Sequence, residues 1–190
     1  MKSKVLKGQY GYLKEQTKKE LIKTIVLFAL SLSLFFIGRI TTGSNKNMLT
    51  IVAVLGFLPA SQYAVRAIMF LRAKGCSEMV YKKVTKVSDG LSVCYDLYLT
   101  SYKKNFQISQ AVMKNKNLIG YTEDAKFDES ACYEHLKSMF MKNGYKDITV
   151  KIFSDIDKYV ERLSSLQESE MEEKTRLQDD VLKLLKDISL

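Results

Sequence analysis

Two long apolar stretches near the N-terminus constrain the fold of this chain more than any other feature. The first is Leu21–Ile40, with fifteen uncharged residues between its two cations, and the second is Met48–Leu71. A helix needs roughly 20 residues to cross about 30 Å of hydrocarbon, and cations near its ends can reach the lipid headgroups. The sequence therefore predicts a transmembrane helical hairpin at 21–72, with spans at about 21–40 and 48–71.

An alternative interpretation of the first stretch is a cleaved signal peptide, with the small residues Thr42–Ser44 as its cleavage site. The charged region before the stretch is unusually long for a signal peptide, and a second apolar stretch follows directly. We therefore favour the hairpin. Residues 1–20 then form a basic N-terminal segment in the cytosol, which can be helical from Leu13 onward.

Positive charge is concentrated beside the apolar stretches. Residues 1–23 carry seven lysines against two acids, whereas the loop Thr41–Asn47 holds one lysine. Because lysine and arginine favour the cytoplasmic flanks of spans, we expect a multi-pass protein of the cell membrane with both termini in the cytoplasm. Residues 128–190 carry fourteen acids against ten basic residues. This uneven distribution differs from that of a uniformly basic nucleic-acid binder, and no nucleic-acid partner is predicted.

The second stretch contains polar residues after Pro59, the only proline of the chain. Gln62 and Arg66 are four residues apart and therefore share one helical face. This face could line a polar path inside a helix bundle, as in a small transport or channel subunit. We favour the simpler interpretation, in which Arg66 reaches the headgroups and the apolar span ends near Val65.

A cytosolic α/β (α+β) domain is predicted for residues 75–166. Its expected order is α-β-β-β-α-β-α, and the short polar turns between the first three strands indicate an antiparallel meander. A helix between strands three and four allows these two to pair in parallel. The expected elements are a helix at 77–88, strands at 92–100, 106–113 and 118–122, a helix at 128–142, a strand at 148–152 and a helix from Ser154 or Asp155.

The first of these strands shows a period of two in its apolar residues. That period predicts one buried and one solvent-exposed face. The predicted buried residues are Val93, Tyr95, Leu97 and Leu99, and the predicted exposed residues are Cys94, Asp96, Tyr98 and Thr100.

Residues 167–190 are predicted to form an acidic stretch, Gln167–Glu173, followed by an amphipathic helix. The helix carries an apolar stripe with spacings of four, three and four, formed by Leu177, Val181, Leu184 and Ile188. Such spacing fits a coiled-coil seam, but it is only about two heptads long. The stripe could dock onto the domain, bind a partner protein or pair with a second copy.

The sequence holds no recognisable catalytic, cofactor-binding or metal-binding signature. The single histidine, His135, lies at the edge of a predicted apolar stripe, which favours a structural role over general base catalysis. The three cysteines are widely spaced and odd in number, which argues for reduced thiols and against a zinc site. We therefore expect no cofactor, and we lean against an enzyme.

The order of predicted elements resembles that of the restriction-endonuclease-like core. The resemblance implies a carboxylate on one strand and an acidic-x-lysine motif on the next, which together hold a divalent metal. Asp96 stands at the first position, but Ser109 and Ala111 occupy those of the second carboxylate and the lysine. With too few hard oxygen ligands, metal-dependent cleavage by this set of residues is not expected. The order of elements alone supports no function.

Tyrosines and lysines of the predicted strands and turns could in principle stack on bases and contact phosphates. These residues are Tyr95, Tyr98, Tyr102 and Tyr121, with Lys103, Lys104, Lys114 and Lys116. We interpret them instead as the ordinary residues of a solvated sheet. The function that the sequence favours is a membrane-anchored interaction or regulatory module. A degenerate hydrolase or nuclease-like domain and a transport subunit are the alternatives.

Overall fold

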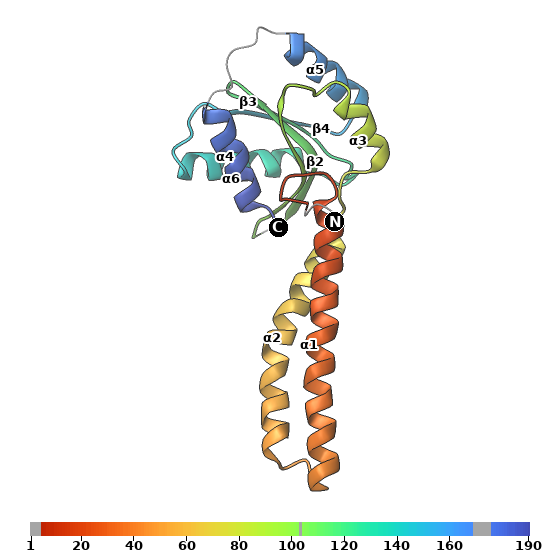
Figure 1. Cartoon of the computed structure of the whole chain (residues 1–190). Helices are drawn as coiled ribbons and strands as arrows, with labels where there is room; N and C mark the ends of the chain where they lie inside the picture. Colours follow the sequence, from red (N-terminus) through yellow and green to blue (C-terminus); the bar gives the residue numbers. More distant parts are fainter. Residues whose placement is uncertain (1–4, 103, 169–175) are drawn as a thin grey trace. The chain divides into compact units, whose positions relative to one another are not determined.

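The computed structural model describes residues 5–102, 104–168 and 176–190 and divides the chain into two compact units (Figure 1). One unit is the helical hairpin Leu13–Ala73. The other, called here the globular unit, comprises the N-terminal residues up to Tyr12 and Lys74–Leu190. Within these described ranges the chain forms six helices and four strands.

The hairpin consists of α1, Tyr12–Thr42, and α2, Met48–Arg72. Both helices are long and apolar enough to cross a membrane by length and composition. Small residues let the two backbones approach closely: a Cβ atom added at Gly56 would lie 2.6 Å from the Ser31 Oγ. On α2 the buried alanines recur every seven residues, at Ala53, Ala60 and Ala67. Most of the large apolar side chains outside this contact are exposed.

The globular unit is built on a four-stranded mixed sheet. Its strands are β1, Ser92–Thr100; β2, Asn105–Lys114; β3, Asn117–Tyr121; and β4, Thr149–Phe153. They lie in the order β1-β2-β3-β4, and the first two pairings are antiparallel. β4 pairs in parallel with β3, as predicted, because α4, Glu129–Lys142, connects them.

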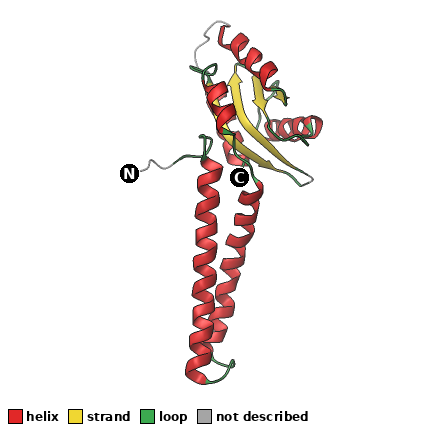
Figure 2. Cartoon of the chain, turned by 90° about the vertical axis from the view of Figure 1, so that its right-hand side faces the viewer, coloured by secondary structure: helices red, strands yellow, loops and turns green. Residues whose placement is uncertain are grey.

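Helices cover both faces of the sheet (Figure 2). α4 and α6, Arg176–Ile188, enclose one apolar core, which contains Leu97, Leu136 and Val181. α3, Glu78–Thr85, and α5, Ile156–Glu168, enclose a second core on the other face, which contains Val84, Tyr95 and Tyr159. The prediction that the first strand has a solvent-exposed face is therefore wrong.

The alternation predicted for the first strand is interrupted at Asp96. This residue has a positive φ of 54° in the middle of β1 and is 3 % exposed. As a result Tyr95 faces the α3–α5 core, whereas Leu97 and Leu99 face the α4–α6 core. The alternation of β2 is interrupted opposite Asp96. Ile108 and Ala111 are three residues apart, yet both lie in the α4–α6 core. The two strands keep the same pairing register on both sides of Asp96, because the alternation is interrupted in both at the same position.

Two segments, one around Gly8 and one at Leu190, form hydrogen bonds with the outer edge of β1. The N–H of Tyr95 donates to the carbonyl of Gly8 at 2.8 Å, and the N–H of Leu190 donates to that of Tyr98 at 2.8 Å. The Lys7 ammonium donates to the Ser189 carbonyl at 2.7 Å. An uncovered edge would offer unpaired backbone groups to other chains. The N-terminal residues, predicted as a basic segment, thus belong in part to the globular unit.

The amphipathic C-terminal helix docks onto the sheet, which is one of the arrangements predicted for it. Val181, Leu182 and Leu185 are buried in the α4–α6 core. Leu177, Leu184 and Ile188 pack against the same core and are partly buried. A partner that used this stripe would first have to displace α6. Most of the predicted acidic stretch Gln167–Glu173 lies outside the described residues.

Candidate functional site

The outer edge of β4 is the open edge of the sheet. Within the described ranges no strand pairs with it. The Thr149 N–H and the Phe153 carbonyl both bond towards β3, at 2.9 Å each. Because alternate residues of a parallel strand bond to the same neighbour, the N–H and C=O groups of Val150 and Ile152 point away from β3. These four groups can pair with one further strand.

Two adjacent cavities lie beside this edge, between β4 and α4. The first has a volume of about 280 Å³ and is lined by Glu129, Ser130, Tyr133, Glu134, Val150 and Ile152. The second, of about 420 Å³, is lined by Tyr133, Lys137, Phe140, Met141, Tyr145, Lys146, Asp147 and Ile148. Tyr133 lines both cavities, and the two together are called here the α4–β4 groove.

One face of α4 supplies a wall of the groove because its residues follow helical spacing. Glu129, Tyr133, Lys137 and Met141 are four residues apart and therefore lie in one row. Asp128 caps the N-terminus of the helix, and its carboxylate accepts from the Ala131 N–H at 3.0 Å and from the Lys104 ammonium at 2.7 Å. These two bonds, the lysine contact first, hold the pKa of Asp128 below its usual range.

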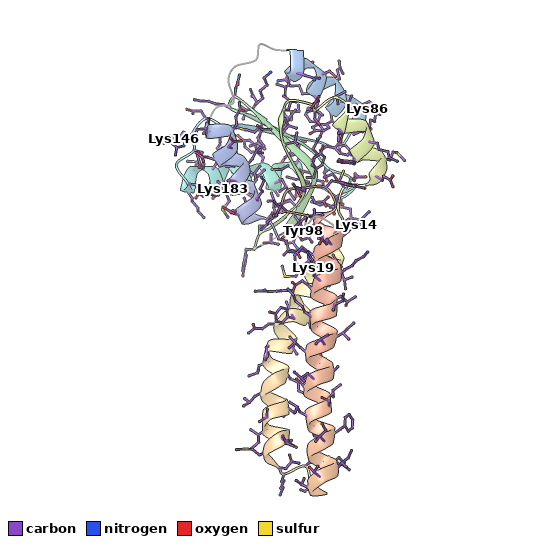
Figure 3. All side chains as sticks on the ribbon, in the orientation of Figure 1. Lys14, Lys19, Lys86, Tyr98, Lys146 and Lys183 are labelled. Carbon is purple, nitrogen blue, oxygen red and sulfur yellow. The ribbon has the colours of Figure 1, made fainter. Side chains whose placement is uncertain are left out.

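Charge and apolar surface are unequally distributed along the groove. The end near Ile152 carries the carboxylates of Glu129 and Glu134. The end near Ile148 carries Lys137 and Lys146 against one carboxylate, Asp147, and Lys146 lies at the outer surface beside α4 (Figure 3). Tyr133, which lines both cavities, is an exposed residue on the wall between them, and Met141 is an exposed apolar residue at the Ile148 end. An elongated ligand would therefore meet negative charge at one end, apolar surface along its length and positive charge at the other end.

The residues of the endonuclease-like prediction are not brought together as a catalytic set. Asp96 and Ser109 lie opposite each other between the pairs Tyr95–Gln110 and Leu97–Ile108, but Ala111 packs in the α4–α6 core. The Asp96 Oδ1 accepts from the Cys76 N–H at 2.7 Å. Among the residues that the structure describes, no group of three His, Cys, Asp or Glu side chains could hold a metal ion.

A second carboxylate, Glu123, was not identified from the sequence. Its Oε2 accepts from the Ser109 hydroxyl and from the Ser77 N–H, both at 2.9 Å. The Lys74 N–H likewise donates to the Gln107 side chain at 3.2 Å. The bonds from Lys74, Cys76 and Ser77 attach the segment that follows α2 to side chains of β2, of β1 and of the residues after β3. We assign this polar cluster a structural role in fixing the entry to the domain.

His135 has the surroundings of a structural residue. Its ring lies 5.7 Å from that of Phe106, and its Nε2 is buried without a hydrogen-bond partner among the described residues. Burial lowers the pKa of His135, with a smaller contribution from Lys142, so the ring is neutral at neutral pH. This arrangement matches the role that the sequence favoured.

The tyrosines proposed for base stacking are mostly inaccessible. Tyr95, Tyr98 and Tyr121 are 7–8 % exposed, and only Tyr102 of the four is free on the surface. Lys114 is also buried and donates to the Leu166 carbonyl, whereas Lys103 lies outside the described residues. The interpretation of these strands as a solvated sheet is therefore wrong, and the described members of this set do not form a stacking surface.

Gln62 and Arg66 lie on an exposed face of α2, beside Tyr63. They line a small cavity of about 70 Å³. The Arg66 guanidinium lies 5.9 Å from the centre of the Tyr63 ring, and the Lys23 ammonium of α1 lies 5.5 Å from the same centre. The predicted polar face is thus accompanied by a cation from the other helix.

None of the three cysteines, all within the described residues, forms a disulfide bond, and all three are buried. Burial raises the pKa of Cys94 to about 11 and that of Cys132 to about 12, so neither forms a thiolate nucleophile at neutral pH. This agrees with the reduced thiols predicted from their number and spacing.

Comparison with known proteins identified no relative of this chain. No protein-family model, curated protein or solved structure matches the chain.

Proposed function

We propose that this chain is a membrane-anchored binding module whose α4–β4 groove takes up an extended segment of a partner protein. The observation that carries the proposal is the coincidence of an open strand edge with two cavities and a charge gradient. An extended peptide can add a strand to such an edge, with backbone bonds for affinity and side-chain pockets for specificity. The module is not an enzyme in this proposal.

The hairpin supplies the anchor. α1 and α2 are long and apolar enough to span a bilayer, and their large apolar side chains are exposed. The lysine-rich N-terminal region favours the cytoplasm for both termini, so the globular unit would lie in the cytoplasm. A cytoplasmic protein segment is accordingly the expected ligand.

A second copy of the chain is a poorer occupant than a different protein. Antiparallel self-pairing centred on β4 would place two Lys151 residues opposite each other, and like charges in that position are destabilising. The charge gradient instead suits a strand with one basic end, alternating apolar residues and one acidic end. The apolar side chains would occupy the two cavities. The basic end would lie in the cavity lined by Glu129 and Glu134, and the acidic end in the cavity lined by Lys137 and Lys146.

The experiment uses the full chain in neutral phosphatidylcholine nanodiscs and two fluorescent peptides. Both peptides carry alternating apolar residues. One has lysine at its N-terminal end and glutamate at its C-terminal end, and the other has these two reversed. We expect the chain to prefer one peptide by roughly fivefold, because exposed ion pairs contribute about 0.2–1 kcal/mol each.

Charge reversal of the groove should reverse this preference. The test variant is Glu134→Lys with Lys137→Glu. The matched control is Lys158→Glu with Glu161→Lys on α5, where two exposed residues have the same spacing of three. Equal binding of both peptides, or a preference that the test variant leaves unchanged, would contradict the proposal. Formation of a dimer that competes with the peptides would favour self-pairing instead.

A further inference from the structure

Two cations and a tyrosine gather at one end of the hairpin. The Lys23 ammonium and the Arg66 guanidinium lie 5.5 Å and 5.9 Å from the centre of the Tyr63 ring. Lys23 comes from α1, and the other two residues come from α2. Cations at this distance from a ring are attracted to its face, so Tyr63 helps to hold both charges at one place.

This cluster marks the boundary of the apolar part of both helices. Fifteen uncharged residues follow Lys23 in α1, and the eighteen residues of α2 before Arg66 are also uncharged. At 1.5 Å per residue these segments are about 22 Å and 27 Å long. Since Lys23 and Arg66 approach the same ring, both segments end at the same level. Arg66 therefore lies at the end of the apolar layer and not at its centre.

The charges of the cluster leave one cation without a carboxylate. Lys23 donates to the Glu20 Oε1 at 2.8 Å and is held in place by it. Among the described residues Arg66 forms no salt bridge, and its side chain is exposed. The sum over Glu20, Lys23 and Arg66 is one positive charge, which a single phosphodiester anion would neutralise.

The groups around Arg66 suit a phosphate. A guanidinium donates two parallel hydrogen bonds to phosphate oxygens, and the Gln62 amide can donate another. The cavity lined by Gln62, Tyr63 and Arg66 measures about 70 Å³. A cavity of this size has room for a small polar group. Tyrosine is also enriched at the headgroup level of membranes.

We propose that Lys23, Gln62, Tyr63 and Arg66 form a binding site for the phosphate of an anionic phospholipid in the cytoplasmic leaflet. The site rests on the membrane location proposed above but not on the α4–β4 groove. It gives the polar face of α2 a role at the headgroup level. Free phosphate shares the same chemistry, so the experiment must separate the two sources.

The experiment measures lipid retention by native mass spectrometry. The full chain is released from nanodiscs of phosphatidylcholine that contain a minor fraction of phosphatidylglycerol. We expect bound phosphatidylglycerol to exceed its share of the disc. The double variant Lys23→Gln with Arg66→Gln should reduce this enrichment by roughly fivefold for each cation removed. Arg39→Gln with Lys46→Gln, at the other end of the hairpin, is the control and should retain the enrichment.

Three results would overturn the proposal. The first is equal retention of both lipids by the unaltered chain, and the second is an equal loss in the control variant. The third is displacement of phosphatidylglycerol by added inorganic phosphate, which would assign the site to the free anion. Alkaline carbonate extraction of membranes keeps this test separate from the anchor itself. A chain that stays in the membrane pellet but shows no lipid preference refutes the lipid site alone, whereas an extracted chain refutes the anchor as well.

Discussion

Replacing Gln110 with leucine is expected to lower the free energy of unfolding of the globular unit by about 2–5 kcal/mol. The Gln110 amide is fully buried; it donates to the Tyr95 hydroxyl at 3.0 Å and accepts from the Tyr159 hydroxyl at 2.9 Å. Leucine fills similar space but leaves both hydroxyls without this partner. Burial raises the pKa of Tyr159 well above its usual value, so its hydroxyl stays protonated and requires an acceptor.

The cysteines provide the measurement. Cys76, Cys94 and Cys132 all lie in the globular unit and are buried, so a maleimide labels them only when this unit opens. The midpoint of labelling in a urea titration of the full chain in mild detergent therefore reports the stability of the unit. The exposed substitution Gln167→Leu is the control. A midpoint for Gln110→Leu that equals the control would contradict the assigned network.

A double variant tests whether the loss of stability comes from the hydrogen bond between Tyr159 and Gln110. Tyr159→Phe removes the donor and leaves the Gln110 carbonyl oxygen without it. Gln110→Leu combined with Tyr159→Phe leaves neither group unsatisfied in this pair. We therefore expect the double variant to be less destabilised than the sum of the two single variants.

Replacing Asp96 with alanine is expected to destabilise the globular unit by about 2–4 kcal/mol. The substitution removes the acceptor of the buried Cys76 N–H. It also places alanine at a φ of 54°, where a Cβ atom is unfavourable and where aspartate and asparagine are tolerated better. Both effects act at the point where the alternation of β1 reverses.

Two further substitutions separate these effects. Asp96→Gly also removes the hydrogen-bond acceptor, but glycine adopts a positive φ without strain. This variant should therefore be more stable than Asp96→Ala by about 1 kcal/mol. Asp96→Asn keeps a side-chain oxygen and tolerates the conformation, and it should be the mildest of the three. The same urea titration checks this order. If alanine proved as stable as aspartate, the positive φ and the Cys76 contact would not contribute as described.

The order of elements could be predicted because each element carries local signals. Asp128 and Ser77 precede their helices as caps, and short polar turns separate the strands. The parallel pairing of β4 with β3 followed from the helix between them. Hydropathy alone located the two long helices of the hairpin, although α1 begins earlier, at Tyr12.

The faces of the sheet could not be predicted, because they depend on distant parts of the chain. No local signal in β1 shows that Asp96 adopts a positive φ, and the N–H that its carboxylate accepts from belongs to Cys76, which lies before α3. Alternation in β1 also suggested one exposed face, but α6, from the C-terminal part of the chain, packs against that face.

The candidate groove was missed for a similar reason. Tyr133, Glu134 and Lys137 lie on the polar side of a predicted amphipathic helix, where exposed residues are ordinary. Their spacing was visible in the sequence, but the edge position of β4 was not, since it is set by the strand order. Only the combination of an open edge with the adjacent helix face makes these residues a site.

The measurement that tests the central claim most directly is the accessibility of single cysteines on the two sides of the membrane. The native cysteines are buried and give little background. Ser44→Cys places a thiol in the loop between α1 and α2, and Ser138→Cys places one on the exposed side of α4. A membrane-impermeant maleimide is applied to intact spheroplasts and, separately, to permeabilised ones.

A membrane-anchored module with both termini in the cytoplasm predicts opposite behaviour of the two thiols. The thiol at position 44 should be labelled in intact spheroplasts, and the thiol at position 138 only after permeabilisation. Labelling at position 138 in intact spheroplasts, or protection at position 44 until permeabilisation, would contradict the account.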